Sequence, residues 1–130
     1  MITNIGTITV HVRDQDRALA FYTQKLGFET RSDQPMGPNQ RWLEVTPSGA
    51  HTRILLYKAT ADAPGADSFE AAQASIGKGT GIVLEVDDIE ATFATLKANG
   101  VPIIEGPTQQ PFGWWGVFAD QDGNTYGVHA

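Results

Sequence analysis

The sequence predicts an α+β fold built from two tandem βαβββ modules, whose mixed sheets are expected to enclose a cleft. Three observations lead to this prediction. Several segments alternate apolar and polar residues as half-buried strands do, two segments place apolar residues at helical spacing, and the pattern of the first half returns in the second. We expect one domain, with a first module at residues 1–58, a linker at residues 59–78 and a second module at residues 79–130.

The first module opens with an alternating strand at residues 7–12. A helix follows, because Asp14 or Asp16 is placed to cap its start and apolar residues then recur at i, i+3 and i+7. Gly27 ends this helix. Three further strands are expected at Phe28–Ser32, Arg41–Thr46 and Thr52–Lys58.

The connector is rich in Ala, Asp and Gly, and one short helical segment is expected in it at Ser68–Ala74. The second module then begins with a strand at Gly81–Val86. Asp87 or Asp88 is expected to cap the next helix, and Asp87 with Glu90 has the spacing of a capping box. The remaining strands are expected at Pro102–Glu105, Trp115–Ala119 and Thr125–His129.

The two halves are related by an internal repeat. HVRDQDRALAFYTQKLGF at residues 11–28 and EVDDIEATFATLKANGV at residues 85–101 match in cap, apolar stripe, length and terminal glycine. Neither half alone carries much of a core, so we expect the two sheets to associate and to enclose a cleft between them.

Composition excludes several classes of function. Lys and Arg number 9 against 15 Asp and Glu, and the net charge of −6 disfavours nucleic acid and anionic membranes as partners. The absence of cysteine excludes disulfides, thiolate nucleophiles and zinc–thiolate sites. No apolar run approaches the roughly 20 residues that span a bilayer, and the first residues lack a signal-peptide pattern, so we expect a cytoplasmic protein.

Two segments carry a resemblance to a known family. DQDRALAFYTQKLGF at Asp14–Phe28 is similar to the D-x-x-x-S/A-x-x-F-Y-x-x-x-L-G-F motif of the vicinal oxygen chelate superfamily, also called the glyoxalase/bleomycin resistance/dioxygenase superfamily. FADQDGNTYGV at Phe118–Val128 is similar to its F-x-D-P-D-G-N motif, with Gln121 in place of the usual proline. Turn chemistry independently predicts a hairpin at residues 122–124, because Gly and Asn tolerate positive φ.

The resemblance implies a divalent metal held by four side chains from the first and last strands of each half. The matching positions in this chain are Thr7, Leu55, Gly81 and Gly127. Leucine and glycine offer no ligand atom, and a lone threonine hydroxyl is a poor neutral ligand. We therefore predict no metal and no other cofactor. We also predict no glyoxalase I activity, which as the family performs it needs a Lewis acid.

The same positions indicate which side chains face the cleft. His11 lies on that face of the first strand, Arg53 and Tyr57 on the fourth and Glu85 on the fifth. Polar side chains of this kind orient a ligand in a mostly apolar pocket, although each could instead be solvated at a strand end.

Aromatic residues are the most unusual feature of the second half. Residues 111–115 are expected to form a loop entering the seventh strand with three large rings, and Trp42 enters the third strand at the related place. Indoles suit stacking on planar or cationic ligands. Alternation directs one of Trp114 and Trp115 inward and the other outward, and packing in the core or at a dimer contact is the competing interpretation.

These observations predict a metal-free protein that binds or sequesters a small organic molecule, aromatic or cationic, and that forms a homodimer through exposed sheet edges. The alternatives are a lyase, isomerase or dioxygenase with a displaced or absent metal and His11 or Glu85 as general base, and a module with a vestigial cleft. The expected ligand-binding residues are His11, Trp42, Arg53, Tyr57, Glu85, Trp114 and Trp115.

Overall fold

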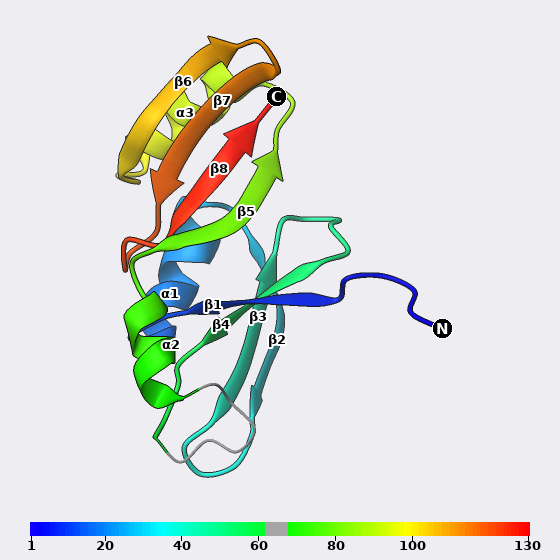
Figure 1. Cartoon of the computed structure of the whole chain (residues 1–130), viewed down its shortest axis with the longest axis vertical. Helices are drawn as coiled ribbons and strands as arrows, with labels where there is room; N and C mark the ends of the chain where they lie inside the picture. The colour runs from blue at the N-terminus through cyan, green and yellow to red at the C-terminus, as the bar shows by residue number, and fades with distance from the viewer. Residues whose placement is uncertain (62–67) are drawn as a thin grey trace. The chain divides into compact units, whose positions relative to one another are not determined.

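The computed structural model describes residues 1–61 and 68–130, so part of the predicted linker lies outside the described residues. The chain divides into two compact units, Met1–Ile76 and Gly77–Ala130, and each is described by itself. Each unit holds one four-stranded mixed sheet (Figure 1). The predicted α+β fold of two tandem βαβββ modules is therefore confirmed.

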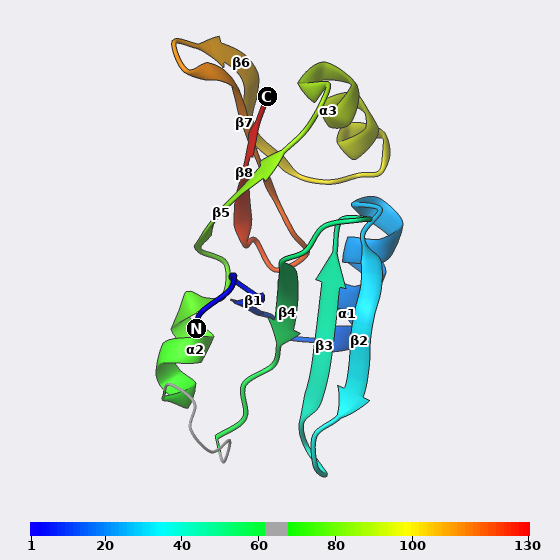
Figure 2. The same ribbon diagram turned by 90° about the vertical axis from the view of Figure 1, so that its right-hand side faces the viewer.

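The first unit contains a sheet of order β1-β4-β3-β2, in which β1 runs parallel to β4 and the other neighbours are antiparallel. Its helix α1 continues as a π-helical turn, η1, and lies beside the sheet (Figure 2). The elements are β1 (Thr7–His11), α1 (Gln15–Ala20), η1 (Phe21–Lys25), β2 (Glu29–Pro35), β3 (Arg41–Thr46), β4 (Arg53–Tyr57) and α2 (Phe69–Ser75).

The second unit repeats this plan with the order β5-β8-β7-β6 and β5 parallel to β8. Helix α3 lies along one face of the sheet, behind β6 and β7 in Figure 1. The elements are β5 (Gly79–Glu85), α3 (Ile89–Ala98), β6 (Ile103–Gln110), β7 (Gly113–Ala119) and β8 (Thr125–His129).

Local sequence explains where the helices begin and end. Asp14, rather than Asp16, caps α1, because its carboxylate accepts the backbone N–H of Arg17 at 2.9 Å. Gly27 follows η1 with φ of 75°, a conformation that side chains with a Cβ rarely adopt. A side-chain cap at the start of a helix, such as that of Asp14, contributes about 1 kcal/mol to the stability of the helix.

The second helix corrects one expectation. Asp88 caps α3 by accepting the N–H of Ala91 at 3.0 Å, so the predicted pairing of Asp87 with Glu90 is wrong. In the linker, the predicted short helix is present as α2, with the Ser68 hydroxyl as its cap.

Each sheet buries one face against its helix. In the second unit Phe93 of α3 fills the space over Gly116, where an added Cβ would lie 2.9 Å from the Cε2 atom of the Phe93 ring. Alternation along β7 then directs Trp115 and Val117 to the opposite face. The fully or nearly buried apolar residues of the two cores include Val10, Phe21, Tyr22, Leu43, Val45, Leu56, Ile89, Phe93, Leu96, Phe118, Tyr126 and Val128.

Strands β2, β5, β6 and β7 are all longer than the sequence pattern predicts, and the difference matters most at β6 and β7. β6 runs on to Gln110, and β7 begins at Gly113, so Trp114 and Trp115 belong to a strand and not to a loop. The register explains this, because Gln109 pairs with Trp114 and Gln110 with Gly113 up to the turn.

The turn before β8 has a different basis from the one expected. Gly123 takes a positive φ of 84°, whereas Asn124 is buried and does not. The Asn124 side-chain amide donates to Asp120 at 2.9 Å, and its oxygen accepts the N–H of Gly77 at 2.8 Å. Asparagine is thus needed here for buried hydrogen bonds.

Among the described residues, no helix is long and apolar enough to cross a membrane.

Candidate functional site

The face of the second sheet opposite α3 gathers most of the unusual side chains of that unit. We call it the aromatic face. Trp115 pairs in register with His129 and Val117 with Gly127, while Glu85 pairs with His129 and Val83 with Gly127 from the other side. The aromatic face comprises Val83, Glu85, Glu105, Trp115, Val117, Gly127 and His129, with Phe112 in the adjoining turn.

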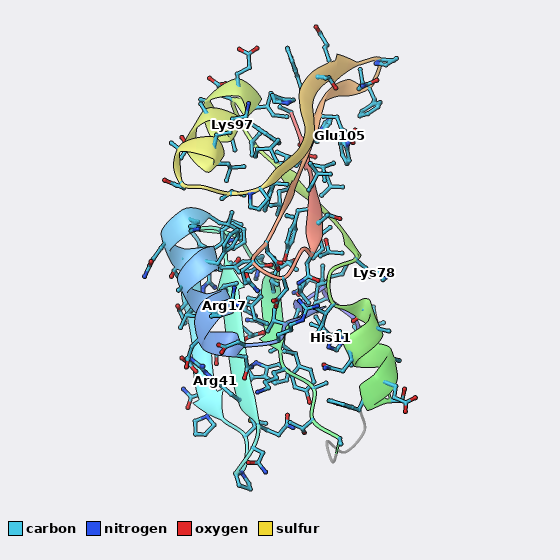
Figure 3. All side chains as sticks on the ribbon, turned by 90° about the vertical axis from the view of Figure 1, so that its left-hand side faces the viewer. His11, Arg17, Arg41, Lys78, Lys97 and Glu105 are labelled. Atoms are coloured by element: carbon cyan, nitrogen blue, oxygen red, sulfur yellow. The ribbon has the colours of Figure 1, made fainter. Side chains whose placement is uncertain are left out.

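The indole of Trp115 is held in one place. It lies over Gly127, because an added Cβ there would lie 2.8 Å from Cζ2 and 3.1 Å from Cζ3 of the ring. Its Nε1–H donates to the carboxylate of Glu105 at 3.1 Å, on β6 (Figure 3). The ring of Phe112 meets it edge-on with centroids 6.1 Å apart. Trp115 is therefore a fixed and partly exposed aromatic surface.

His129 connects three elements of this unit. Its Nδ1 lies 2.9 and 3.0 Å from the two carboxylate oxygens of Glu85, and its Nε2 lies 3.2 Å from the backbone carbonyl of Phe112. The Phe112 ring also stacks on the imidazole at 6.3 Å. A carboxylate and a carbonyl only accept hydrogen bonds, so both ring nitrogens donate when the imidazole is protonated.

The hydrogen bond to Glu85, followed by the one to the Phe112 carbonyl, raises the pKa of His129 above its ordinary value of 6.5. Glu85, expected to be a ligand contact or a general base, is thus engaged by His129 in the structure.

Trp114 lies on the other side of the strand. Its backbone N–H donates to the carbonyl of Ala130 at 2.9 Å, and alternation puts its side chain on the same side as Gly116 and the α3 ring that packs there. Of the two adjacent tryptophans, Trp115 is the one on the aromatic face.

In the first unit, the sheet face opposite the buried core carries polar and aromatic residues, and we call it the polar face. It comprises Thr7, Thr9, His11, Trp42, Glu44, Thr46, Arg53, Leu55 and Tyr57, which share one side by alternation and by the register of β1, β3 and β4.

A buried carboxylate anchors one end of the polar face. Glu44 has only 7% of its side chain exposed, and its Oε2 accepts the hydroxyl of Thr7 at 2.7 Å. The Nε of Arg53 lies 3.3 Å from the same oxygen, and 38% of the Arg53 side chain is exposed. The pair is a built feature of the sheet, because a buried carboxylate without a partner would be strongly unfavourable.

The other end of the polar face is aromatic. The rings of His11 and Tyr57 meet edge-on with centroids 6.0 Å apart, and Figure 3 marks His11 on β1. The Tyr57 hydroxyl donates to the side-chain oxygen of Gln40 at 2.9 Å. Trp42, two residues before Glu44 on β3, is 37% exposed. The structure thus brings His11 and Tyr57 into contact and leaves an indole partly exposed on the same face.

Sequence reasoning did not select Glu44, Glu105, Phe112 or His129 as site residues. Glu44 carried a signal, since a charged residue within the apolar run of β3 requires a buried partner. For Glu105 and His129 the contacts depend on cross-strand register, which a single sequence does not display.

The positions that the resemblance assigns to a metal do not fit one. Leu55 is buried and apolar, and the place beside Gly127 is filled by the Trp115 ring. Within residues 1–61 and 68–130, no group of three or more His, Asp or Glu side chains is arranged to hold a metal ion. The donor set at these positions therefore lacks the oxygen and nitrogen atoms that a divalent ion requires.

Residues 4–128 match the model of the Glyoxalase/Bleomycin resistance protein/Dioxygenase superfamily. The chain belongs to this superfamily. The resemblance seen in the two sequence motifs is thereby confirmed.

Individual relatives cover nearly all of the chain. The uncharacterized protein YetH of Bacillus subtilis (strain 168) is 40% identical over 126 residues, 97% of each chain. The crystal structure of TnmS3, an antibiotic-binding protein from Streptomyces sp. CB03234, is 34% identical, with a TM-score of 0.79 over 98% of this chain and 95% of that one. A superfamily member from Sphaerobacter thermophilus DSM 20745 is 33% identical, with a TM-score of 0.84 over 98% and 97%.

Proposed function

We propose that this protein binds a small organic molecule with an aromatic ring and does so without a metal. The observation that carries the proposal is the indole of Trp115, which occupies the place beside Gly127 where the resemblance implies a metal ligand. A fixed, partly exposed indole offers a flat apolar surface for a planar group, and it loses little entropy when that group binds.

Of the two ligand classes expected from the sequence, the aromatic one is better supported. Glu85 is already paired with His129, and Glu105 already accepts the indole N–H, so neither carboxylate is reserved for a cation. Stacking on Trp115 needs no charge on the ligand. We also propose that His11, Trp42, Arg53 and Tyr57 make the polar face of the first sheet, by itself, a surface that contacts a small organic ligand.

The comparison with TnmS3 supports a binding function, because that antibiotic-binding protein shares 34% of its sequence and nearly the whole fold with this chain. Fold alone does not establish a shared ligand. We propose the same class of activity, the capture of an antibiotic-like organic molecule. A catalytic role gains no specific observation, since both ring nitrogens of His129 are occupied and Glu85 is bound to it.

Tryptophan fluorescence tests the proposal. A panel of aromatic compounds is titrated against the full chain, and saturable quenching that is unchanged by EDTA is the expected result. Trp115→Leu should weaken binding by about 1 kcal/mol, roughly fivefold. Trp114→Leu is the matched control, because that side chain lies on the α3 side of β7. Failure of every compound to quench, or equal binding by the Trp115 variant, would contradict the proposal.

We also propose that the chain forms a homodimer. In the described part of each sheet two strands stand at the ends, β1 and β2 in the first and β5 and β6 in the second, and unpaired strand edges favour association. Sedimentation at micromolar concentration should show a dimer, and a purely monomeric species would contradict this assembly.

A further inference from the structure

We propose that Arg53, braced by the buried carboxylate of Glu44, binds the carboxylate group of an aromatic ligand on the polar face of the first sheet. This inference rests on the proposed function, because it assigns one chemical group of the molecule that the protein would hold. It adds a charge requirement that Trp115 stacking does not provide.

The guanidinium of Arg53 is positioned by Glu44 and, through it, by Thr7. Its Nε faces Oε2 of Glu44 at 3.3 Å, and that oxygen is itself held by the Thr7 hydroxyl at 2.7 Å. Thr7 pairs with Arg53 in the register of β1 and β4, so all three side chains belong to neighbouring strands of one sheet. An arginine held on rigid strands loses less freedom on binding than one on a loop.

The terminal nitrogens of Arg53 remain available. A guanidinium has five N–H donors, of which four are on the two Nη atoms. In the part of the chain that the structure describes, Glu44 is the only ion-pair partner of Arg53, and it meets Nε alone. The Arg53 side chain is 38% exposed, and no hydrogen bond joins its Nη atoms to an acceptor among the described residues of this unit.

The charge of Arg53 is also the only one of its kind on this face. No other residue of the polar face is a lysine or an arginine. The chain as a whole carries −6, but interactions between exposed charges are largely screened beyond about 8 Å at physiological salt. The one nearby negative charge on this face, the buried Glu44 carboxylate, is already paired with Nε of Arg53. An anion that reaches the Nη atoms therefore meets the guanidinium, whose planar fork matches the two oxygens of a carboxylate.

The aromatic residues of the same face indicate what the acid group is attached to. Arg53 and Tyr57 stand four residues apart on β4, which separates their Cα atoms by roughly 13 Å. The rings of His11 and Tyr57 lie at the far end, and Trp42 lies on the neighbouring strand. A molecule that bridges these ends has an acid group at one end and a ring at the other.

The test compares two probes of nearly equal shape, biphenylcarboxylate and biphenylcarboxamide, by calorimetric titration of the full chain. The carboxylate should bind at least about tenfold more tightly, because a charge-assisted bidentate pair is about twice as strong as a neutral hydrogen bond. In Arg53→Gln this preference should disappear, because the carboxylate loses its cationic partner while the carboxamide loses only a neutral hydrogen bond. Arg53→Lys should keep only part of the preference, since it retains charge without the fork.

Two further variants serve as controls, one for the unpaired buried charge and one for the loss of a positive charge. Arg53→Gln leaves the Glu44 carboxylate without its cation, so the double variant Arg53→Gln/Glu44→Gln provides a neutral pair with no buried charge, and it too should show no preference. Arg17→Gln removes one positive charge from the surface of α1 (Figure 3), and it should bind both probes like the wild type.

Each other result has a definite meaning. Equal affinity of the wild type for both probes overturns the carboxylate site and leaves the proposed stacking function standing. A carboxylate preference that survives in both Arg53→Gln variants also overturns it. If neither probe binds, the inference is wrong for aromatic acids, and the proposed function fails only if the wider fluorescence panel fails as well.

Discussion

In the first sheet, the last residues of β1 and β4 are paired, which places His11 beside Tyr57. In the second sheet, the last residues of β5 and β8 are paired, which places Glu85 beside His129. One repeat position thus holds an edge-on contact between two rings and, in the other unit, an ion pair. The strand order is the same in both sheets. The fold therefore tolerates a complete change of chemistry at a position on the face away from the helix.

The same comparison explains why the two indoles behave differently. Glu44 pairs with Leu55 in the first sheet, and Val117 pairs with Gly127 at the corresponding place in the second. Trp42 and Trp115 each lie two residues earlier on their strands. Leu55 has a side chain at the place where Gly127 leaves a gap, and the Trp115 ring fills that gap. The glycine on β8 thus provides one of the contacts that hold the ring, beside Glu105 and Phe112.

The largest expected effect is a loss of stability when a buried ring is removed from the helix–sheet packing that both units share. Phe21→Ala and Phe93→Ala each remove a buried ring from a helix that packs on its sheet, and each should destabilise the protein by about 3–4 kcal/mol. Chemical denaturation of the two variants provides the measurement. If one variant costs under about 1 kcal/mol, the helix-side packing of the two units is not equivalent.

The next largest effect is expected when Gly127 of the second sheet is replaced by leucine, the residue at the corresponding place in the first sheet. Gly127→Leu places a side chain where the Trp115 ring lies, and it should cost about 2 kcal/mol of stability through overpacking. The displaced indole should also lose its ability to report a bound aromatic compound. Gly79→Ala is a control in the same sheet, because an added Cβ there meets its nearest atom, Oγ1 of Thr125, at an ordinary 3.6 Å. A Gly127→Leu protein with native stability and native Trp115 emission would contradict the account of the indole.

The third prediction concerns pH and the ion pair that the first sheet lacks at this position. The pKa of His129 is raised in the folded state, so its pairing with Glu85 stabilises the protein fully below the unfolded value of 6.5. That stability is lost as pH rises through the higher folded pKa. In Glu85→Gln the His129 resonance should titrate at lower pH, and the loss of stability above neutrality should shrink. Identical His129 titration in both proteins would show that Glu85 is not its partner in solution.

The sequence predicted the fold well because the helix-side residues follow simple rules. Alternation located β3 and β8 at their observed ends, and Asp14 and Gly27 marked the limits of the first helical segment. The errors include Asp87, since Asp88 provides the cap, and Asn124, where buried hydrogen bonds and not backbone conformation require the residue. Trp114 was expected in a loop and belongs to strand β7. Gly77, one partner of Asn124, is distant in sequence, and the place of Trp114 depends on the pairing of β6 with β7, which a single-strand pattern does not encode.

The candidate site was predicted less completely for the same physical reason. His11, Arg53 and Tyr57 lie on the expected strand face, but the pairing of Arg53 with Glu44 and of Glu85 with His129 depends on the register of adjacent strands. Trp115 was one of two equivalent candidates until the ring of Phe93 over Gly116 showed which side of β7 faces the helix.

The smallest expected effect concerns the hydrogen bond that fixes the edge of the Trp115 ring. Glu105→Gln keeps an oxygen within reach of the indole N–H but removes the negative charge, so the bond should weaken by less than about 1 kcal/mol in this exposed position. The fold and the stacking of the ring on Gly127 should persist. The indole N–H of Trp115 should exchange with solvent faster in the variant, while that of Trp42, on the other sheet, should not change. Nitrogen–proton NMR measures both signals in one experiment, and an unchanged Trp115 exchange rate would mean that the glycine alone, without the carboxylate, holds the ring in place.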